Sequence, residues 1–435
     1  RAWLFATSAE EHVLVLLLHH IAGDGWSFGP LLRDLALAYE ARSQGQPPAW
    51  SDLPVQYADY TIWQREVLGD EADPASPIAA QLGYWRQTLA DLPEQLDLPY
   101  DHARPVTPSH RGDRVGIRLD ATLHGKLLTL AKDSKASLFM VLQAGVSALL
   151  TRLGAGTDIP LGSPIAGRTD VALDDLVGFF VNTLVLRTDT SGNPSFQDLL
   201  ARVREQDLAA YANQDLPFER LVEVLNPPRS FARHPLFQVM LVLQNNARSH
   251  FELPGVTLAR FKGGGTQTAK FDLSLSFSEE RGSDGSAKGL SGRIEYATDL
   301  FERQTIEDLA VRLERLLQAV VSDPAQPIGH LDILGEEERH RLLVEWNATA
   351  QAVADVTLPG LLEAQVARSP QATALVYEET SLSYGELNAR ANQLAHYLIA
   401  AGAGPESIVG LCLERSIEMV IGLLAILKAG AAYLP

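Results

Sequence analysis

Runs of apolar residues and alternating polar positions divide the chain into short helices and strands. Residues 13–18 are an unbroken apolar run, which predicts a strand buried on both faces. Residues 137–153 are strongly apolar over a helical length and begin at Ser137, a suitable N-cap. The remaining strands and helices follow one another without a regular β-α-β rhythm. The pattern therefore predicts an α/β protein of the α+β or layered type. Further strands are expected at residues 115–119, 159–165, 179–186, 237–243 and 271–277, and further helices at 31–41, 57–90, 196–211, 218–225 and 303–321.

A stretch without periodicity separates two folded regions. Residues 345–357 show neither helical nor strand spacing, and we interpret them as a linker. Beyond them, helices are expected at 361–367, 384–401 and 417–429, with a buried strand at 408–412. At 435 residues the chain is long enough for two or three domains.

Composition narrows the function classes. The chain has 36 Lys and Arg against 54 Asp and Glu, a net charge of −18, which disfavours binding to nucleic-acid backbones. No apolar run is long enough to span a membrane. The single cysteine, Cys412, excludes an internal disulfide framework and a Cys-rich zinc site. Because residues 1–4 lack the layout of a signal peptide, we expect a soluble, cytoplasmic protein.

Both ends of the sequence lie in segments that are expected to be folded. The chain begins without Met in a strand-like stretch and stops at residues 431–435, directly after an apolar helix. Termini usually lie in exposed polar sequence, so we interpret the chain as an internal piece of a longer polypeptide. A processed or differently assigned start is the alternative.

The residues that most strongly indicate a functional site are His19-His20, followed by Asp24-Gly25. Neighbours on a strand point to opposite faces, so only one histidine would face a given cavity. Glycines at 23 and 25 allow a sharp turn and close approach of a substrate, and Asp24 could anchor the loop through a cation. On these residues alone, structural or metal-binding roles stay open beside a catalytic one, although adjacent histidines are poorly placed to bind one ion.

Residues 19–25 resemble the H-H-x-x-x-D-G signature of acyltransferases with the chloramphenicol-acetyltransferase-like fold. Trp26-Ser27 narrows the resemblance to condensation domains of nonribosomal peptide synthetases. Asn213 departs from the family pattern, which usually has His there. Residues 382–387 and 427–435 are similar to the first two motifs of an adenylation domain. Other segments resemble later condensation signatures in the expected order: 53–60, 84–85, 98–105, 177–184, 214–219 and 234–239.

The resemblance implies a two-lobed condensation domain followed by a truncated adenylate-forming domain. Residues 1–125 would be the remnant of the N-terminal lobe with the His motif, and 126–344 the C-terminal lobe. Residues 345–357 would be the linker, and 358–435 the start of the adenylation domain. Its phosphate loop would lie beyond the sequence, so no ATP site is expected, and this piece alone is expected to be inactive.

The implied reaction is attack of an acceptor aminoacyl amine on a donor thioester. His20 would serve the amine as a base or as a positioning group, and the Gly25 N–H could stabilise an oxyanion. Asp24 is also a candidate catalytic residue, as a loop anchor paired with Arg168. His19 and Arg168 would have structural roles. A channel between the two lobes would be lined by His20.

The resemblance also implies partners and cofactors. Upstream donor and downstream acceptor peptidyl carrier domains would present 4'-phosphopantetheine, which is not attached to this chain. The remainder of the adenylation domain would be a further partner and would use ATP and Mg. No metal ligand, cofactor-binding residue, nucleic acid or membrane is expected here, and the setting would be secondary-metabolite or antibiotic biosynthesis.

Three other types of domain with this fold are alternative interpretations. Heterocyclisation domains replace the His motif with an Asp-rich one, which His19-His20 contradicts. Epimerisation domains are usually followed by another condensation domain rather than by adenylation-like sequence. Non-catalytic docking or recruitment domains usually lose the active histidine, and the presence of His20 and Asp24 weighs against that reading without removing it.

Overall fold

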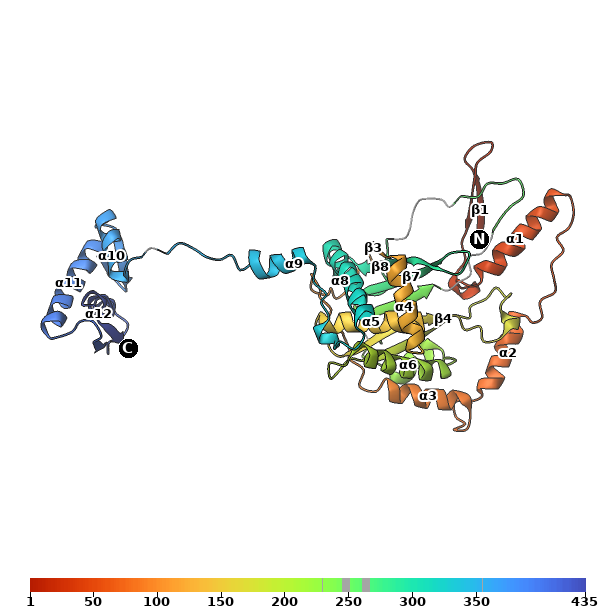
Figure 1. Cartoon of the computed structure of the whole chain (residues 1–435), viewed down its shortest axis with the longest axis horizontal. Coiled ribbons are helices and arrows are strands. Elements are labelled where there is room, and N and C mark those ends of the chain that lie inside the picture. Colours follow the sequence, from red (N-terminus) through yellow and green to blue (C-terminus); the bar gives the residue numbers. More distant parts are fainter. Residues whose placement is uncertain (229, 245–250, 260–266, 354) are drawn as a thin grey trace. The chain divides into compact units, whose positions relative to one another are not determined.

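The computed structural model describes residues 1–228, 230–244, 251–259, 267–353 and 355–435. The chain divides into two compact units, residues 1–341 and 342–435. The first unit contains a mixed six-stranded sheet, and the second contains three helices with short strand pairs (Figure 1).

The sheet of the first unit has the strand order β3-β8-β7-β6-β4-β5. The pairs β3–β8, β8–β7 and β4–β5 are antiparallel, whereas β7–β6 and β6–β4 are parallel. The mixture of parallel and antiparallel pairs confirms the predicted α/β class. The strand bounds are β3 Gly112–Leu119, β4 Asp158–Ile165, β5 Asn182–Asp189, β6 Val239–Gln244, β7 Leu273–Arg281 and β8 Ala287–Ala297.

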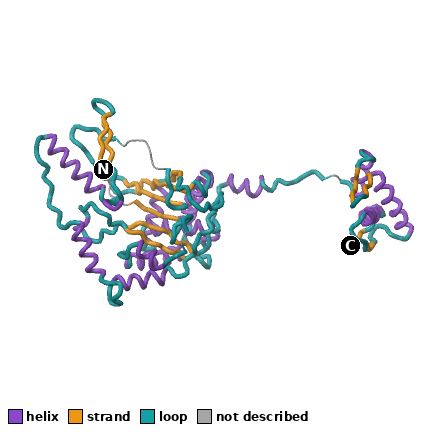
Figure 2. The backbone as a smooth tube through the Cα atoms, turned by 180° about the vertical axis from the view of Figure 1, so that it is seen from behind, coloured by secondary structure: helices purple, strands orange, loops and turns teal. Residues whose placement is uncertain are grey.

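Four helices cover one face of this sheet (Figures 1 and 2): α4 Ala121–Asp133, α5 Leu138–Arg152, α6 Phe196–Ala212 and α8 Arg303–Ser322. α5 is the predicted core helix, and the Ser137 hydroxyl accepts the Met140 N–H as its N-cap. A Cβ on Gly145 would lie 2.8 Å from the Leu317 side chain, so glycine allows α5 and α8 to cross closely. α3 (Pro77–Thr88) and α7 (Phe218–Leu225) pack together beside β5.

The N-terminal residues form a hairpin, and one prediction about it is wrong. β1 (Ala2–Ala6) pairs with β2 (His12–Leu16), but no described residues cover both faces of β2. Leu14 is 43% exposed and Leu17 58% exposed, whereas the sequence predicted a strand buried on both faces. An apolar run shows which residues gain from burial, but it does not show whether another layer of the fold covers them.

The expected boundary between residues 125 and 126 falls inside α4. β3 pairs with β8 along its full length, and α4 packs on β8. Residues 112–119, which the expected boundary assigns to the N-terminal lobe, therefore share a sheet with β8 of the expected C-terminal lobe.

The second unit begins at Leu342, inside the π-helical turn Arg341–Glu345 that follows α9 (Glu336–His340). No helix or strand lies between Trp346 and Thr357 among the described residues. The Ser383–Glu386 capping box begins α11. The expected strand at 408–412 is shorter and not buried: it ends at Gly410, pairs with β12, and leaves Ile408 72% exposed. The bounds are α10 Leu358–Arg368, β9 Thr373–Tyr377, β10 Thr380–Ser383, α11 Tyr384–Ala400, β11 Ile408–Gly410, α12 Ile417–Lys428 and β12 Ala432–Leu434.

Within the described residues, no single helix has the length and apolar composition needed to cross a membrane. α4 and α5 meet that criterion only as a pair, with a bend of 103° between them.

One carboxyl group lies inside the core of the first unit. Asp207 on α6 is fully buried, and its Oδ1 accepts a hydrogen bond of 3.0 Å from Gln143 Nε2 on α5. Its Oδ2 has no hydrogen-bond partner within the part of the chain that the structure describes. Burial raises the pKa of Asp207 from 3.8 to about 7, although the Gln143 hydrogen bond opposes this shift.

We predict that Asp207→Asn stabilises the fold most at alkaline pH. Between pH 3.8 and 7 the folded state retains a proton that the unfolded state has lost, so stability falls as pH rises through this window and levels off above it. The variant lacks this penalty, which is worth up to about 4 kcal/mol. Urea unfolding at pH 5 and pH 8 measures it. Glu205→Gln, an exposed change on the same helix, is the control; equal pH slopes in wild type and Asp207→Asn would contradict the prediction.

Candidate functional site

The two histidines lie at the start of a short turn rather than on a strand. β2 ends at Leu16, and His20 begins a 3-10 turn, His20–Ala22. His19 is the N-cap of this turn, and its Nδ1 accepts the Ile21 N–H at 3.2 Å. The premise that strand alternation separates the two side chains is therefore wrong. Both histidines are exposed, and the difference between them now rests on contacts: His19 caps the turn, whereas the His20 ring meets the Phe179 ring.

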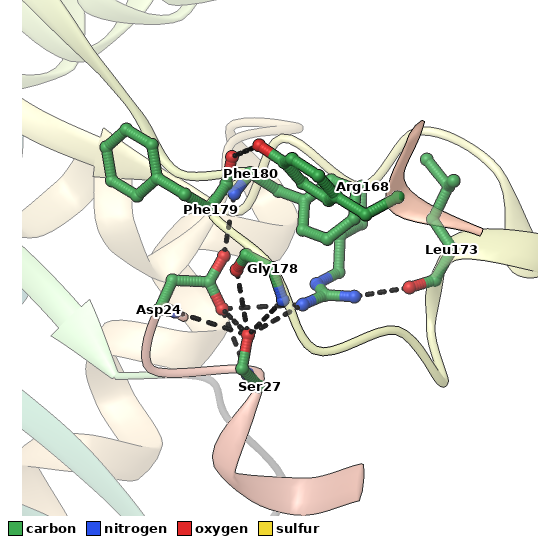
Figure 3. Close-up of polar contacts among 8 residues, drawn as sticks. Asp24, Ser27, Arg168, Leu173, Gly178, Phe179 and Phe180 are labelled. Atoms are coloured by element: carbon green, nitrogen blue, oxygen red, sulfur yellow. Dashed lines mark hydrogen bonds and ion pairs between the residues drawn. The ribbon is translucent and has the colours of Figure 1, made fainter. Parts of the chain in front are cut away.

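Asp24 is the buried anchor of the loop that follows. Its Oδ1 accepts hydrogen bonds from the Ser27 N–H at 2.9 Å and the Ser27 hydroxyl at 2.8 Å. Its Oδ2 accepts the Phe180 N–H at 3.0 Å, which joins residues 156 positions apart. The Asp24 N–H in turn donates to Ser27 Oγ at 3.2 Å (Figure 3).

Arg168 completes this network and forms the expected pair with Asp24. Its Nη2 lies 3.4 Å from Asp24 Oδ1 and 3.2 Å from Ser27 Oγ, and both charged side chains are buried. Its Nη1 donates to the Leu173 carbonyl, and its guanidinium lies 4.1 Å from the centre of the Phe180 ring. A Cβ at Gly167, whose φ is +65°, would lie 1.9 Å from the Phe180 carbonyl oxygen. Only glycine therefore fits directly before Arg168.

The electrostatics of Asp24 follow from these contacts. Burial alone would raise the pKa of this carboxyl, but hydrogen bonds from Phe180 and Ser27 and the charge of Arg168 outweigh it and lower the pKa below 3.8. Asp24 is therefore ionised at neutral pH. Both carboxylate oxygens accept hydrogen bonds from Ser27 and Phe180, an arrangement that anchors the loop.

The third segment that contributes to the site is α2 (Tyr57–Leu68). The Tyr57 hydroxyl donates to the Phe179 carbonyl at 2.7 Å. A Cβ on Gly178 would lie 2.3 Å from the Tyr57 ring. The Phe179 ring meets the His20 ring edge-on, with centroids 5.2 Å apart and an interplanar angle of 83°. Residues 178–180 thus join the His20 loop, Arg168 and α2.

Sequence reasoning missed several members of this site. Ser27, Tyr57 and Phe179 lay within segments compared with family signatures, but they were given no role. For Ser27 a local signal existed, a hydroxyl three residues after an Asp. The contacts of Ser27 with Gly178 and of Tyr57 with Phe179 join residues more than 100 positions apart, and spacing along the sequence does not encode such contacts.

The other predicted residues have simpler surroundings. Gly25 is exposed, and its N–H has no hydrogen-bond partner among the described residues. Asn213 ends α6 and donates to the Ala209 carbonyl, while its own carbonyl accepts the Trp85 N–H, so it takes no part in the Asp24 network. The described residues contain no group of three or more His, Cys, Asp or Glu side chains arranged to hold a metal. A surface hollow lined by residues of α1 (Phe28–Ser43) and by 252–254 does not include His20, and the channel beside His20 stays a prediction.

The chain is similar to known proteins along its whole length. Residues 1–343 match the Condensation domain family, and residues 362–435 match the AMP-binding enzyme family. A dimodular nonribosomal peptide synthase of Bacillus subtilis is 57% identical over 435 residues, which are 100% of this chain and 18% of that protein. The chain therefore spans less than a fifth of the length of this relative.

Two solved structures are also similar. The X-domain from teicoplanin biosynthesis, solved in complex with OxyB, is 38% identical with a TM-score of 0.71, over 77% of this chain and 73% of that one. The four-domain nonribosomal peptide synthetase AB3403, bound to AMP and glycine, is 26% identical with a TM-score of 0.84, over 100% of this chain and 33% of that one.

We predict that Asp24→Ala destabilises the first unit by about 3–5 kcal/mol at pH 7, because Arg168 is then left buried without its carboxylate. Since the pKa of Asp24 is lowered in the folded state, its contribution is present above pH 3.8 and is lost as pH falls through the folded value. The difference in the free energy of unfolding should therefore narrow in acid.

Urea unfolding at pH 7 and pH 3 measures this difference. Asp175→Ala is the matched control, because Asp175 pairs with Arg33 in an exposed ion pair, which should contribute only about 0–1 kcal/mol. Equal losses for the two variants at pH 7 would count against a buried anchor.

Proposed function

The chain belongs to the condensation-domain family of nonribosomal peptide synthetases, followed by the start of an AMP-binding enzyme domain, and we propose that residues 1–343 catalyse peptide-bond formation. The observation that supports this most directly is that one residue of the H-H-x-x-x-D-G segment is buried and another is exposed. Asp24 is enclosed by hydrogen bonds, whereas His20, four residues earlier, is exposed. An exposed imidazole on a rigid loop is suited to meet a substrate.

In the proposed reaction, the α-amine of an acceptor aminoacyl thioester attacks the carbonyl carbon of a donor thioester. A C–N bond forms, and the C–S bond breaks when the tetrahedral intermediate collapses. Because a free α-amine has a pKa near 8, a useful fraction is neutral at pH 7. The attacking nitrogen must then lose a proton, and the departing thiolate must gain one.

We propose that His20 positions the attacking amine and accepts its proton. Its imidazole makes no hydrogen bond among the described residues, so both ring nitrogens are free for a ligand. A positioned general base contributes about 10²–10⁴-fold in rate. The Gly25 N–H, which has no partner in the described part of the chain, would donate to the oxygen that becomes negative in the intermediate. Asp24, Ser27 and Arg168 would keep these two groups in place.

The substrates would arrive on phosphopantetheine arms of donor and acceptor carrier domains, which are proposed partners. A thioester is already activated, so the reaction needs no ATP. In the complete synthetase, ATP would serve the adenylation domain that begins with residues 362–435. No described group in these residues forms a cluster of acidic or histidine ligands for a metal, and no step is assigned to them.

Partner recruitment is a second candidate function. It is supported by the 38% identity to an X-domain that was solved in complex with OxyB. In that case His20 would be an ordinary exposed residue, and the Asp24 network would serve only the fold. The two candidates differ in what removal of the His20 imidazole does.

We predict that His20→Ala, in a synthetase that contains this chain, lowers the rate of dipeptidyl-thioester formation by about 10²–10⁴-fold. Adenylation and thioester loading should continue, because they use a separate domain. Mass spectrometry of donor-loaded and acceptor-loaded carriers provides the measurement. His19→Ala is the control: it removes a turn cap, at about 1 kcal/mol of stability, and should retain activity. A normal yield from His20→Ala would exclude the catalytic role and favour recruitment.

A further inference from the structure

The His20 side chain makes few contacts with the described residues. It lies at the start of a three-residue 3-10 turn and is exposed. Among the described residues it makes one ring contact, with Phe179, and its imidazole makes no hydrogen bond. An exposed side chain without an anchor samples several rotamers. Something else must orient the imidazole if it acts on a bound amine, and Phe179 is the ring beside it.

The backbone around Phe179 is fixed from both sides. Ser27 Oγ lies 3.1 Å from the Gly178 nitrogen and 2.9 Å from the Gly178 carbonyl oxygen. Asp24 accepts the N–H of Phe180, and the Tyr57 hydroxyl donates to the carbonyl of Phe179 itself. Three side chains from two separate segments therefore hold consecutive peptide groups (Figure 3).

The neighbouring residues cannot take the place of Phe179. The space beside Gly178 is filled by the Tyr57 ring. Phe180 is 5% exposed, with its ring between the Arg168 guanidinium and the rings of Tyr57 and Tyr60. Phe179 is 36% exposed, and its ring is the one in this segment that contacts His20.

We propose that Phe179 is a positioning residue that orients the His20 imidazole through an edge-to-face contact, with the Tyr57 hydroxyl as its support. The proposal rests on the proposed role of His20 in peptide-bond formation. An aromatic pair of this geometry is strong enough to change a rate by about 2- to 12-fold. The effect belongs to the chemical step, because Phe179 acts through His20.

The test compares three side chains at position 179 in a synthetase that contains this chain. Phe179→Leu removes the aromatic ring, and Phe179→Tyr retains it. We expect the leucine variant to lower the single-turnover rate of dipeptidyl-thioester formation about 2- to 12-fold, at unchanged half-saturation by the acceptor carrier. The tyrosine variant should remain within about twofold of wild type. Limited proteolysis of each variant, compared with wild type, checks that the first unit is folded, because thioester loading depends on a separate domain.

A second comparison tests the support of Phe179. Tyr57→Phe removes one hydroxyl and its hydrogen bond to the Phe179 carbonyl, and it should lower the same rate by about 2- to 5-fold. Tyr60→Phe is the matched control on the same helix, because the Tyr60 hydroxyl makes no hydrogen bond in the described residues. It should not change the rate.

A double-mutant cycle separates positioning from a general effect on the fold. If Phe179 acts through His20, the loss caused by Phe179→Leu should disappear in a His20→Gln background, where the slow residual rate is followed over hours. An equal loss in both backgrounds, a wild-type rate for Phe179→Leu, or equal losses for the leucine and tyrosine variants would each overturn the proposal. A full rate for His20→Gln would instead overturn the proposed function on which it rests. A slow His20→Gln with a normal Phe179→Leu would overturn the positioning role alone.

Discussion

The candidate site depends on one requirement, that the buried carboxylate of Asp24 has partners. An ionised carboxylate without hydrogen bonds or a counter-charge would be strongly unfavourable in the interior. The partners come from a backbone amide at Phe180, from Ser27 and from Arg168, and they tie the His20 loop to residues more than 140 positions later. The arrangement of the loop is therefore a consequence of how this charge is neutralised. The shorter hydrogen bonds from Ser27 and Phe180 hold the carboxylate more closely than the 3.4 Å contact with Arg168, so the ion pair is only one part of the anchor.

The same requirement separates the roles of the two titratable motif residues. Hydrogen bonds that favour the charged form lower the pKa of Asp24, and a carboxylate of low pKa is a poor acceptor for a proton from an amine. His20 has none of these constraints, since it is exposed at the start of a short turn and its one aromatic contact among the described residues is with the Phe179 ring. One segment of seven residues thus combines a buried charged anchor with an exposed imidazole. In the proposed mechanism the anchor stabilises the loop, and proton transfer is left to His20.

Sequence patterns predicted the elements more securely than their surroundings. The core helix from Leu138 was predictable because its apolar length and its N-cap are local properties. Burial of β2 was not, because it depends on a second layer of structure that the strand's own residues do not specify. Strand alternation failed at His19 and His20, since the hydrogen bond from the Ile21 N–H to His19 favours a turn over an extended strand. The pairing of Asp24 with Arg168 was predictable only through family resemblance. Ser27, Tyr57 and Phe179 were not predicted at all, because their roles arise from contacts that exist only after the chain has folded.

Two glycines show how far the requirements of the site extend beyond groups that could touch a substrate. A side chain at Gly167 would overlap the carbonyl of Phe180, and one at Gly178 would overlap the ring of Tyr57. Either change would move the segment that supplies the Phe180 amide to Asp24, so both positions are restricted by packing rather than by chemistry. His20 differs in kind: it is exposed, and its loss would leave the buried network intact. If His20 has the proposed role, a domain of this fold can lose its base and keep its architecture, which gives a physical reason why catalytic and recruitment domains can share one scaffold. Under this proposal, the two functions differ in one exposed ring and in the contact that orients it.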